Sequence, residues 1–147
     1  MVDIAPSQIG HEDLMHATLV WHPFTRGGWG FENKLDGFRA LARRELNHVE
    51  LLSRTGRSIG PCFPEIANAS KRVPGEWVLD GELVVPDARG HPSFELVRRR
   101  GVMTRPKSIV TAAAATPAAF CVFDALFVED AEVRSFHWPS ARICSAP

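Results

Sequence analysis

Cysteine, lysine and long apolar runs are all scarce in this 147-residue sequence. The three cysteines, Cys62, Cys121 and Cys144, are widely spaced and form no C-x-x-C pair, which argues against a disulfide framework and a zinc site. The six histidines show no spacing typical of metal ligands. No apolar run is long enough to span a membrane, and the N-terminus lacks a signal-peptide pattern. We therefore expect a reduced, cytoplasmic protein with no membrane partner.

A net charge is also missing, because 17 Lys and Arg residues balance 17 Asp and Glu residues. The chain therefore has no overall positive field that would argue for nucleic-acid binding. The lysines are Lys34, Lys71 and Lys107, so arginine supplies most of the positive charge. Arginine suits contacts with phosphate, although GC-rich coding explains the bias more simply. A content of 45% hydrophobic and 23% charged residues is typical of one globular domain or a piece of one.

Short apolar stretches separated by turn residues predict an α+β domain built on antiparallel sheet with short helices. We expect strands over residues 29–33, 39–46, 49–54, 77–85 and 118–128. One helix is expected over 63–71, and a second over 94–100 with Ser93 as its cap. Irregular stretches are expected as a flexible N-terminal arm over 1–13, a loop over 101–118 and an off-pattern tail over 134–147.

One segment of the sequence, FENKLDGFRALAR, combines residue types that suit chemistry on a phosphate. Lys34 and Asp36 share a face if the backbone is extended, and Gly37 permits a turn or a close approach. Arg39 offers a planar fork for phosphate or carboxylate. A lysine amine, with a free pKa of about 10.4, is a poor nucleophile unless a site of cations, metal and excluded water activates it. By itself the motif is ambiguous, because Asp-Gly is also a common hairpin turn.

Two further groups of charged residues have alternative explanations. Asp80 and Glu82 lie inside an apolar strand, where carboxylates are unfavourable unless they have a partner or a task. A basic cluster near the second helix fits either contact with the DNA backbone or a solvated helix end. This cluster consists of Arg98, Arg99, Arg100, Arg105 and Lys107.

Four separated motifs occur in a fixed order: KLDGFR from Lys34, SRTG from Ser53, DGEL from Asp80 and FDAL from Phe123. Together they resemble the covalent nucleotidyltransferase superfamily, and most closely the ATP-dependent DNA ligases of the bacterial end-joining (ligase D) type. The resemblance covers about residues 15–135 and includes the sequence between the motifs. A capping-type or RNA ligase relative is the less favoured alternative, because the SRTG and DGELV contexts are those of DNA ligases.

The resemblance implies a role for each matching residue. Lys34 is expected to be the nucleophile that attacks the α-phosphate of ATP and becomes lysyl-AMP. Phe123 is expected to stack on adenine, and Glu82 to contact ribose or a metal ion. The expected ATP-binding residues are Glu32, Arg39, Arg54, Glu82 and Phe123, and the supporting residues are Asp36, Gly37 and Asp80. The implied cofactors are ATP and Mg²⁺ or Mn²⁺, and the implied partner is nicked or broken double-stranded DNA.

The sequence also departs from the family pattern. The family places a Glu-Gly motif and a motif with two lysines after the fourth motif, but this chain has no Glu-Gly pair and no lysine after Lys107. We therefore expect an incomplete adenylation domain over 14–133, without the OB-fold module. Two functions stay open. The first is a DNA ligase, whose remaining part another gene could encode. The second is an inactive remnant with at most weak ATP or DNA binding.

Overall fold

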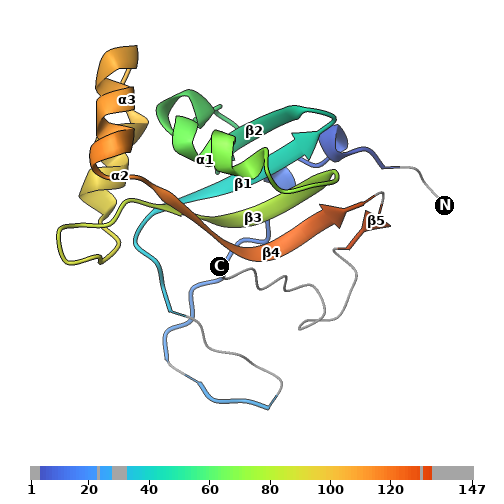
Figure 1. Cartoon of the computed structure of the whole chain (residues 1–147). Coiled ribbons are helices and arrows are strands. Elements are labelled where there is room, and N and C mark those ends of the chain that lie inside the picture. Colours follow the sequence, from blue (N-terminus) through green and yellow to red (C-terminus); the bar gives the residue numbers. More distant parts are fainter. Residues whose placement is uncertain (1–3, 23, 28–32, 130, 134–147) are drawn as a thin grey trace.

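The computed structural model describes residues 4–22, 24–27, 33–129 and 131–133. Its centre is an antiparallel sheet with the strand order β2-β1-β3-β4-β5 in the described part of the chain (Figure 1). The strands are β1 (Phe38–Glu45), β2 (His48–Ser53), β3 (Trp77–Val84), β4 (Ala119–Val128) and β5 (Ala131–Glu132). The predicted α+β class with antiparallel sheet and short helices is confirmed.

Strand β1 forms although its sequence has high helix propensity. It pairs with β2 on one side and with β3 on the other, so its backbone groups are satisfied along both edges. Ala40, Leu41 and Ala42 are fully buried there. Tertiary pairing and burial on both faces therefore override the local preference.

Three α-helices are present in the described residues: α1 (Pro64–Ser70), α2 (Phe94–Gly101) and α3 (Pro106–Ala115). The predicted cap of α2 is confirmed, since the Ser93 hydroxyl accepts a hydrogen bond from the Leu96 backbone N–H at 3.4 Å. The expected loop over 101–118 is wrong, because α3 occupies most of it. Pro106 supplies the fixed φ of a first helical position, the alanine-rich end has high helix propensity, and Ile109 is buried.

Helices α1 and α2 cover one face of the sheet. Phe63 and Ile66 from the α1 region and Val97 of α2 pack with Ala42 and Leu83 of the sheet in one buried cluster. The T-shaped contact of Phe38 with Phe94, at 5.6 Å between ring centroids, adds to this side. This face therefore holds the larger part of the core.

The opposite face is covered in part by the N-terminal segment. Two short 3-10 helices, η1 (Pro6–Gln8) and η2 (His11–Asp13), place Ile9 and Leu14 in a second buried cluster with Leu41, Val78 and Phe127. The Arg43 guanidinium donates to the carbonyl oxygens of Ser7 at 3.0 Å and Ile9 at 3.3 Å. The flexible arm expected over 1–13 is therefore wrong for its described residues, because buried side chains and backbone hydrogen bonds hold them on the sheet.

Two expectations fall on residues that the structure does not describe. These are most of the strand predicted over 29–33 and the off-pattern tail over 134–147. Within the described ranges, no helix is both long enough and apolar enough to cross a membrane.

Candidate nucleotide-binding site

Lys34 lies on the irregular segment that leads into β1, and its side chain is exposed. A cavity of about 380 Å³ adjoins it on the sheet face that carries Arg39. Three of the four sequence motifs contribute side chains to this cavity. Its lining residues are Asn33, Lys34, Leu35, Arg39, Glu82, Cys121, Val122 and Phe123.

Arg39 is held in a fixed orientation by a buried carboxylate. Its Nε lies 3.1 Å from Asp80 Oδ1 and its Nη2 lies 2.6 Å from Asp80 Oδ2. The Asp80 side chain is only 2% exposed, and the hydrogen bond that it accepts raises the pKa of Arg39. A bidentate pair of this kind restricts the guanidinium plane as well as its position. Asp80, which the sequence predicted as a supporting residue, thus orients Arg39.

Phe123 lies beneath the same guanidinium. The Arg39 Cζ is 5.5 Å from the centroid of the Phe123 ring, a distance at which a cation–π contact forms. Phe123 is half-buried and lines the cavity. The cavity therefore combines a flat aromatic surface with a cation fixed above it.

Glu82 is the carboxylate of the cavity wall. Its Oε1 accepts a hydrogen bond from the Gly37 backbone N–H at 3.1 Å. Burial raises the pKa of the Glu82 carboxyl, against the opposing effects of the Gly37 N–H and the charges of Arg39 and Lys34. In the described part of the chain, no three His, Cys, Asp or Glu side chains come together as a metal site.

Two residues of β4 near the cavity had no role in the sequence prediction. Asp124 faces Asp80 across the β3–β4 pair, and burial followed by the Asp80 charge raises the pKa of its carboxyl. Burial followed by the charge of Glu82 raises the pKa of the Cys121 thiol. An acidic residue in the middle of an apolar strand was the available signal for Asp124. The sheet register that places it beside Asp80 was not readable from the sequence.

Arg54 and Gly37 line a second hollow of about 590 Å³, which shares Arg39 and Glu82 with the first. Arg54 and Asp36 are both exposed. Arg57, another residue of this wall, donates to the Gly101 carbonyl oxygen at 3.2 Å. Glu32, one of the expected ATP-binding residues, lies outside the described residues.

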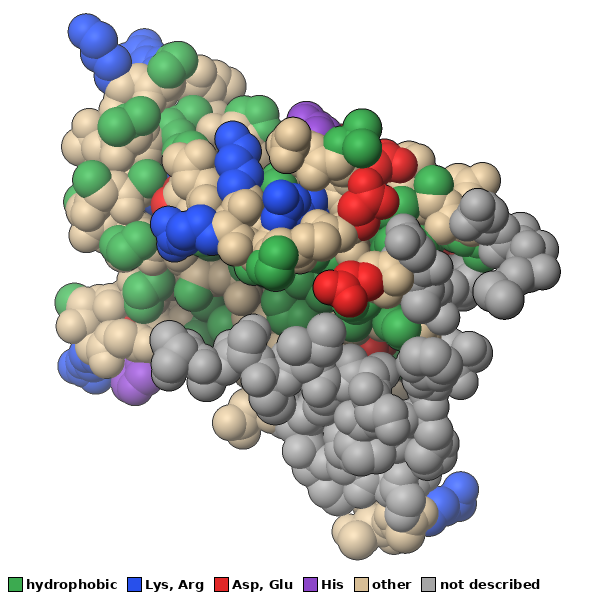
Figure 2. Space-filling model, turned by 45° about the vertical axis from the view of Figure 1, so that its right-hand side comes forward, with side chains coloured by type: hydrophobic (Ala, Val, Ile, Leu, Met, Phe, Trp, Pro, Cys, Tyr) green, Lys and Arg blue, Asp and Glu red, His purple; other side chains and the backbone are tan. Residues whose placement is uncertain are grey.

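The predicted DNA-contact cluster separates into two kinds of residue. Arg98, Arg99, Arg105 and Lys107 are exposed, whereas Arg100 is only 3% exposed. The Arg100 guanidinium pairs with Glu65 at 2.9 Å and lies 5.2 Å from the Phe63 ring centroid, so its assignment to DNA is corrected to a structural role. On the face shown in Figure 2, Lys and Arg side chains lie in separate small groups, not in one continuous stripe.

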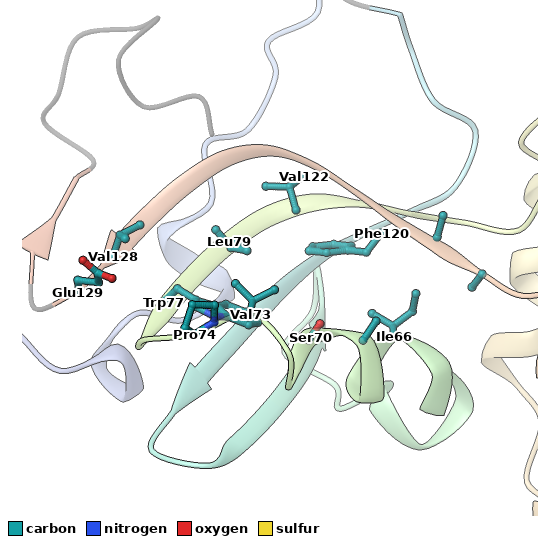
Figure 3. Close-up of a pocket in the computed structure, with 13 residues that line it drawn as sticks. Ile66, Ser70, Val73, Pro74, Trp77, Leu79, Phe120, Val122, Val128 and Glu129 are labelled. Carbon is teal, nitrogen blue, oxygen red and sulfur yellow. The ribbon is translucent and has the colours of Figure 1, made fainter. Parts of the chain in front are cut away.

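An apolar groove of about 390 Å³ lies between α1 and strands β3 and β4 (Figure 3). Ile66 and Val73 form its α1 side, and Leu79, Phe120 and Val122 form its sheet side. Along the outer edge of β4, β5 pairs with Phe127 and Val128, so in the described chain the edge from Ala119 to Ala125 has no partner strand. The groove and this edge adjoin each other.

Comparison with known proteins identifies relatives over most of the chain. The model of the ATP dependent DNA ligase domain matches residues 16–140. DNA ligase C1 of Mycolicibacterium smegmatis is 38% identical over 129 residues, which is 85% of this chain and 37% of that protein. The multifunctional non-homologous end joining protein LigD of Pseudomonas aeruginosa is 35% identical over 120 residues, which is 80% of this chain and 13% of that protein.

The fold agrees with solved ligase domains. The ligase domain of LigD from M. tuberculosis superposes with a TM-score of 0.59 at 30% identity, over 76% of this chain and 33% of that chain. A mycobacterial DNA ligase D complexed with ATP and MES gives the same TM-score, identity and coverage. The chain thus spans about a third or less of the length of these relatives.

Proposed function

Because the chain belongs to the family of ATP-dependent DNA ligase domains, we propose that it binds ATP and that Lys34 is its catalytic nucleophile. The observation that carries the proposal is the convergence of Lys34, Arg39, Glu82 and Phe123 on one cavity, from segments up to 89 positions apart. A related ligase D has been solved with ATP, which agrees with the assignment of this ligand.

The proposed step is nucleotidyl transfer to an amine. The Lys34 Nζ forms a bond to the α-phosphorus of ATP, the bond between that phosphorus and the α–β bridging oxygen breaks, pyrophosphate leaves, and the amine loses a proton. Catalysis of this kind depends mainly on position and charge. Arg39, oriented by Asp80, directs its positive charge at the phosphates or ribose, and Phe123 offers an aromatic surface for adenine.

A divalent cation, when bound, would neutralise phosphate charge at this site. Mg²⁺ commonly binds through one or two carboxylates together with substrate phosphates and water, so the absence of a three-residue cluster in the described chain does not conflict with this role. Family resemblance assigns the contact with such a cation to Glu82, the carboxylate that lines the cavity. Arg54, exposed on the adjoining hollow, is proposed to contact nucleotide or the DNA 5′-phosphate.

Sealing of a nick or break in double-stranded DNA needs more than this cavity. The later lysine motifs of the family do not occur in the sequence. We propose that the corresponding remainder of a ligase domain, on whichever polypeptide carries it, docks on the groove beside α1 and adds a strand to the open edge of β4. Unpaired backbone groups next to an apolar groove support this occupant, because both features favour an added strand.

A second candidate is a remnant that binds nucleotide or DNA weakly and carries out no transfer. The absence of a Glu-Gly pair and of any lysine beyond Lys107 favours it. Both candidates share the nucleotide cavity, so they differ in whether a covalent bond to Lys34 forms.

Self-adenylation separates the two candidates. The purified chain is incubated with α-labelled ATP and Mg²⁺ or Mn²⁺, and label that survives denaturation is measured. We expect label on the wild type and on Lys71→Ala, an exposed lysine at the end of α1, and none on Lys34→Ala. Nucleotide binding by the folded wild type without covalent label would overturn the transferase proposal and leave the remnant.

A further inference from the structure

Gly37 anchors the segment that carries Lys34 closely to the sheet. Gly37 lies directly against β3, since a Cβ at this position would be 2.3 Å from the Leu83 carbonyl oxygen and 2.9 Å from Val84 Cγ1. Its N–H donates to Glu82 Oε1 at 3.1 Å. The β1 ladder begins one residue later, at Phe38. Gly37 is therefore the point at which the irregular segment meets the rigid sheet.

The anchor is close enough to Lys34 to matter for its position. Three residues of extended chain span at most about 10 Å, so fixing Gly37 confines the Cα of Lys34 to a small volume beside the cavity. Positioning of a nucleophile is worth a large factor in rate, and small displacements are costly. A group that holds Gly37 thus acts on Lys34 through the backbone.

Glu82 is well placed to hold Gly37 in position. Glu82 lies in the middle of β3, paired with Arg39 of β1 and Cys121 of β4, so its backbone is fixed on both sides. Its side chain lines the same cavity as Lys34. A hydrogen bond from a backbone N–H to a carboxylate is stronger than one between neutral groups.

We infer that Glu82 is a positioning residue: its carboxylate holds the Lys34 segment in a productive place through the Gly37 N–H. The inference rests on the proposed function of Lys34 as nucleophile. It differs from the ribose or metal contact implied for Glu82 by family resemblance. Loss of such a contact weakens ATP or metal binding, whereas loss of the anchor lowers the rate of transfer from a bound complex.

Hydrogen exchange of the Gly37 amide tests the anchor without any activity. In the nucleotide-free protein, Glu82→Ala is expected to speed exchange at Gly37 by about tenfold or more, the effect of losing a hydrogen bond to a charged group. Glu82→Gln keeps an acceptor oxygen and should stay within a few-fold of wild type. The matched control is Glu76→Ala, which removes a similar bond from the Leu46 N–H at 2.8 Å and should act at Leu46, not at Gly37.

Single-turnover self-adenylation tests the consequence for Lys34. Glu82→Ala should lower the maximal rate by about tenfold or more while the half-saturating ATP concentration stays within about twofold, and Glu82→Gln should recover most of the rate. Unchanged Gly37 exchange, or a full rate with weakened ATP binding, would overturn the inference. If the wild type takes no label, the proposed function of Lys34 is wrong, but the inference about Glu82 is not yet decided. Hydrogen exchange at Gly37 then decides whether Glu82 anchors the segment.

Discussion

Three carboxylates surround one guanidinium at the floor of the cavity, and their environments differ. Asp80 forms the bidentate pair with Arg39, while the pKa values of Glu82 and Asp124 are both raised, in each case mainly by burial. Asp124 gains one backbone hydrogen bond, from the Ala125 N–H at 2.9 Å. The negative charge of Asp124 is therefore less well compensated than that of Asp80, its partner across β3 and β4.

The pKa direction for Asp124 leads to a prediction with a definite sign. A carboxyl whose pKa is raised on folding favours the folded state below its ordinary value of 3.8, and that contribution is lost as pH rises through the raised value. Asp124→Asn keeps the acceptor oxygen and removes the charge. We expect a higher Tm than wild type at pH 7, with the gain shrinking as pH falls toward 4 in thermal unfolding.

Asp87 is a control, because its pKa is shifted in the opposite direction from that of Asp124. Backbone N–H groups of His91 and Arg89 lower the pKa of its carboxyl, so its contribution to stability is present at neutral pH and is lost as pH falls. Asp87→Asn should lower the Tm at pH 7 and have little effect at low pH. The same pH dependence for both variants would contradict the assignment of charge burial to Asp124.

Arg100 connects α2 to neighbouring elements through several hydrogen bonds. Its Nη2 donates to Glu65 Oε1 at 2.9 Å and to the Cys62 carbonyl oxygen at 3.0 Å, and its Nη1 donates to the Thr116 carbonyl oxygen at 3.3 Å. Glu65 also accepts from the Ala118 N–H at 3.0 Å, at the entrance to β4. The pair thus joins α2 to α1 and to the end of α3.

Removal of Arg100 should therefore destabilise the helical layer. Arg100→Ala leaves Glu65 without its cation and is expected to lower the free energy of unfolding by about 3–5 kcal/mol. Arg99→Ala, at the exposed neighbouring position, should change it by no more than about 0.5 kcal/mol. Urea unfolding measures both variants. A loss at Arg100 no greater than at Arg99 would show that the pair contributes nothing to stability.

At the scale of the whole molecule, the sheet is covered unevenly. The N-terminal segment and the helices each bury a cluster, but the groove beside α1 and the adjoining β4 edge lack cover in the described chain. An apolar groove next to unpaired strand backbone favours association with another segment. The proposed occupant is the part of a ligase domain that this chain does not match.

Charge placed at the groove should block that association. Ala119 is exposed and lines the groove, so Ala119→Glu is expected to weaken binding of the unmatched part of M. smegmatis DNA ligase C1 by at least about tenfold, because the new carboxylate would be buried unpaired. Ala114→Glu, exposed on α3, is the control. Calorimetric titration measures the affinity of both variants for this part of the ligase. Equal binding by the two variants would exclude the groove as the docking surface.

Much of the sheet could be predicted from the sequence alone, and so could several residues that line the candidate cavity. Strands follow from local apolar patterning and turn residues, and the four motifs lie on or beside those strands, so Lys34, Arg39, Glu82 and Phe123 were identifiable before their convergence was known. The prediction failed at α3 and at the N-terminal segment. At α3, helix propensity competed with a loop-like composition. In the N-terminal segment, burial of Ile9 depends on side chains more than 30 positions away, which local sequence does not show.

The tertiary structure alone decided which similar residues differ in role. Arg98, Arg99 and Arg100 are adjacent and chemically identical, but the phase of α2 relative to Glu65 buries only Arg100 among the three. The Glu82–Gly37 hydrogen bond joins residues 45 positions apart, and the Asp80–Asp124 pair depends on the register of β3 and β4. Residue types and their local order are properties of the sequence, whereas partners across the sheet depend on register and packing, which only the folded chain specifies.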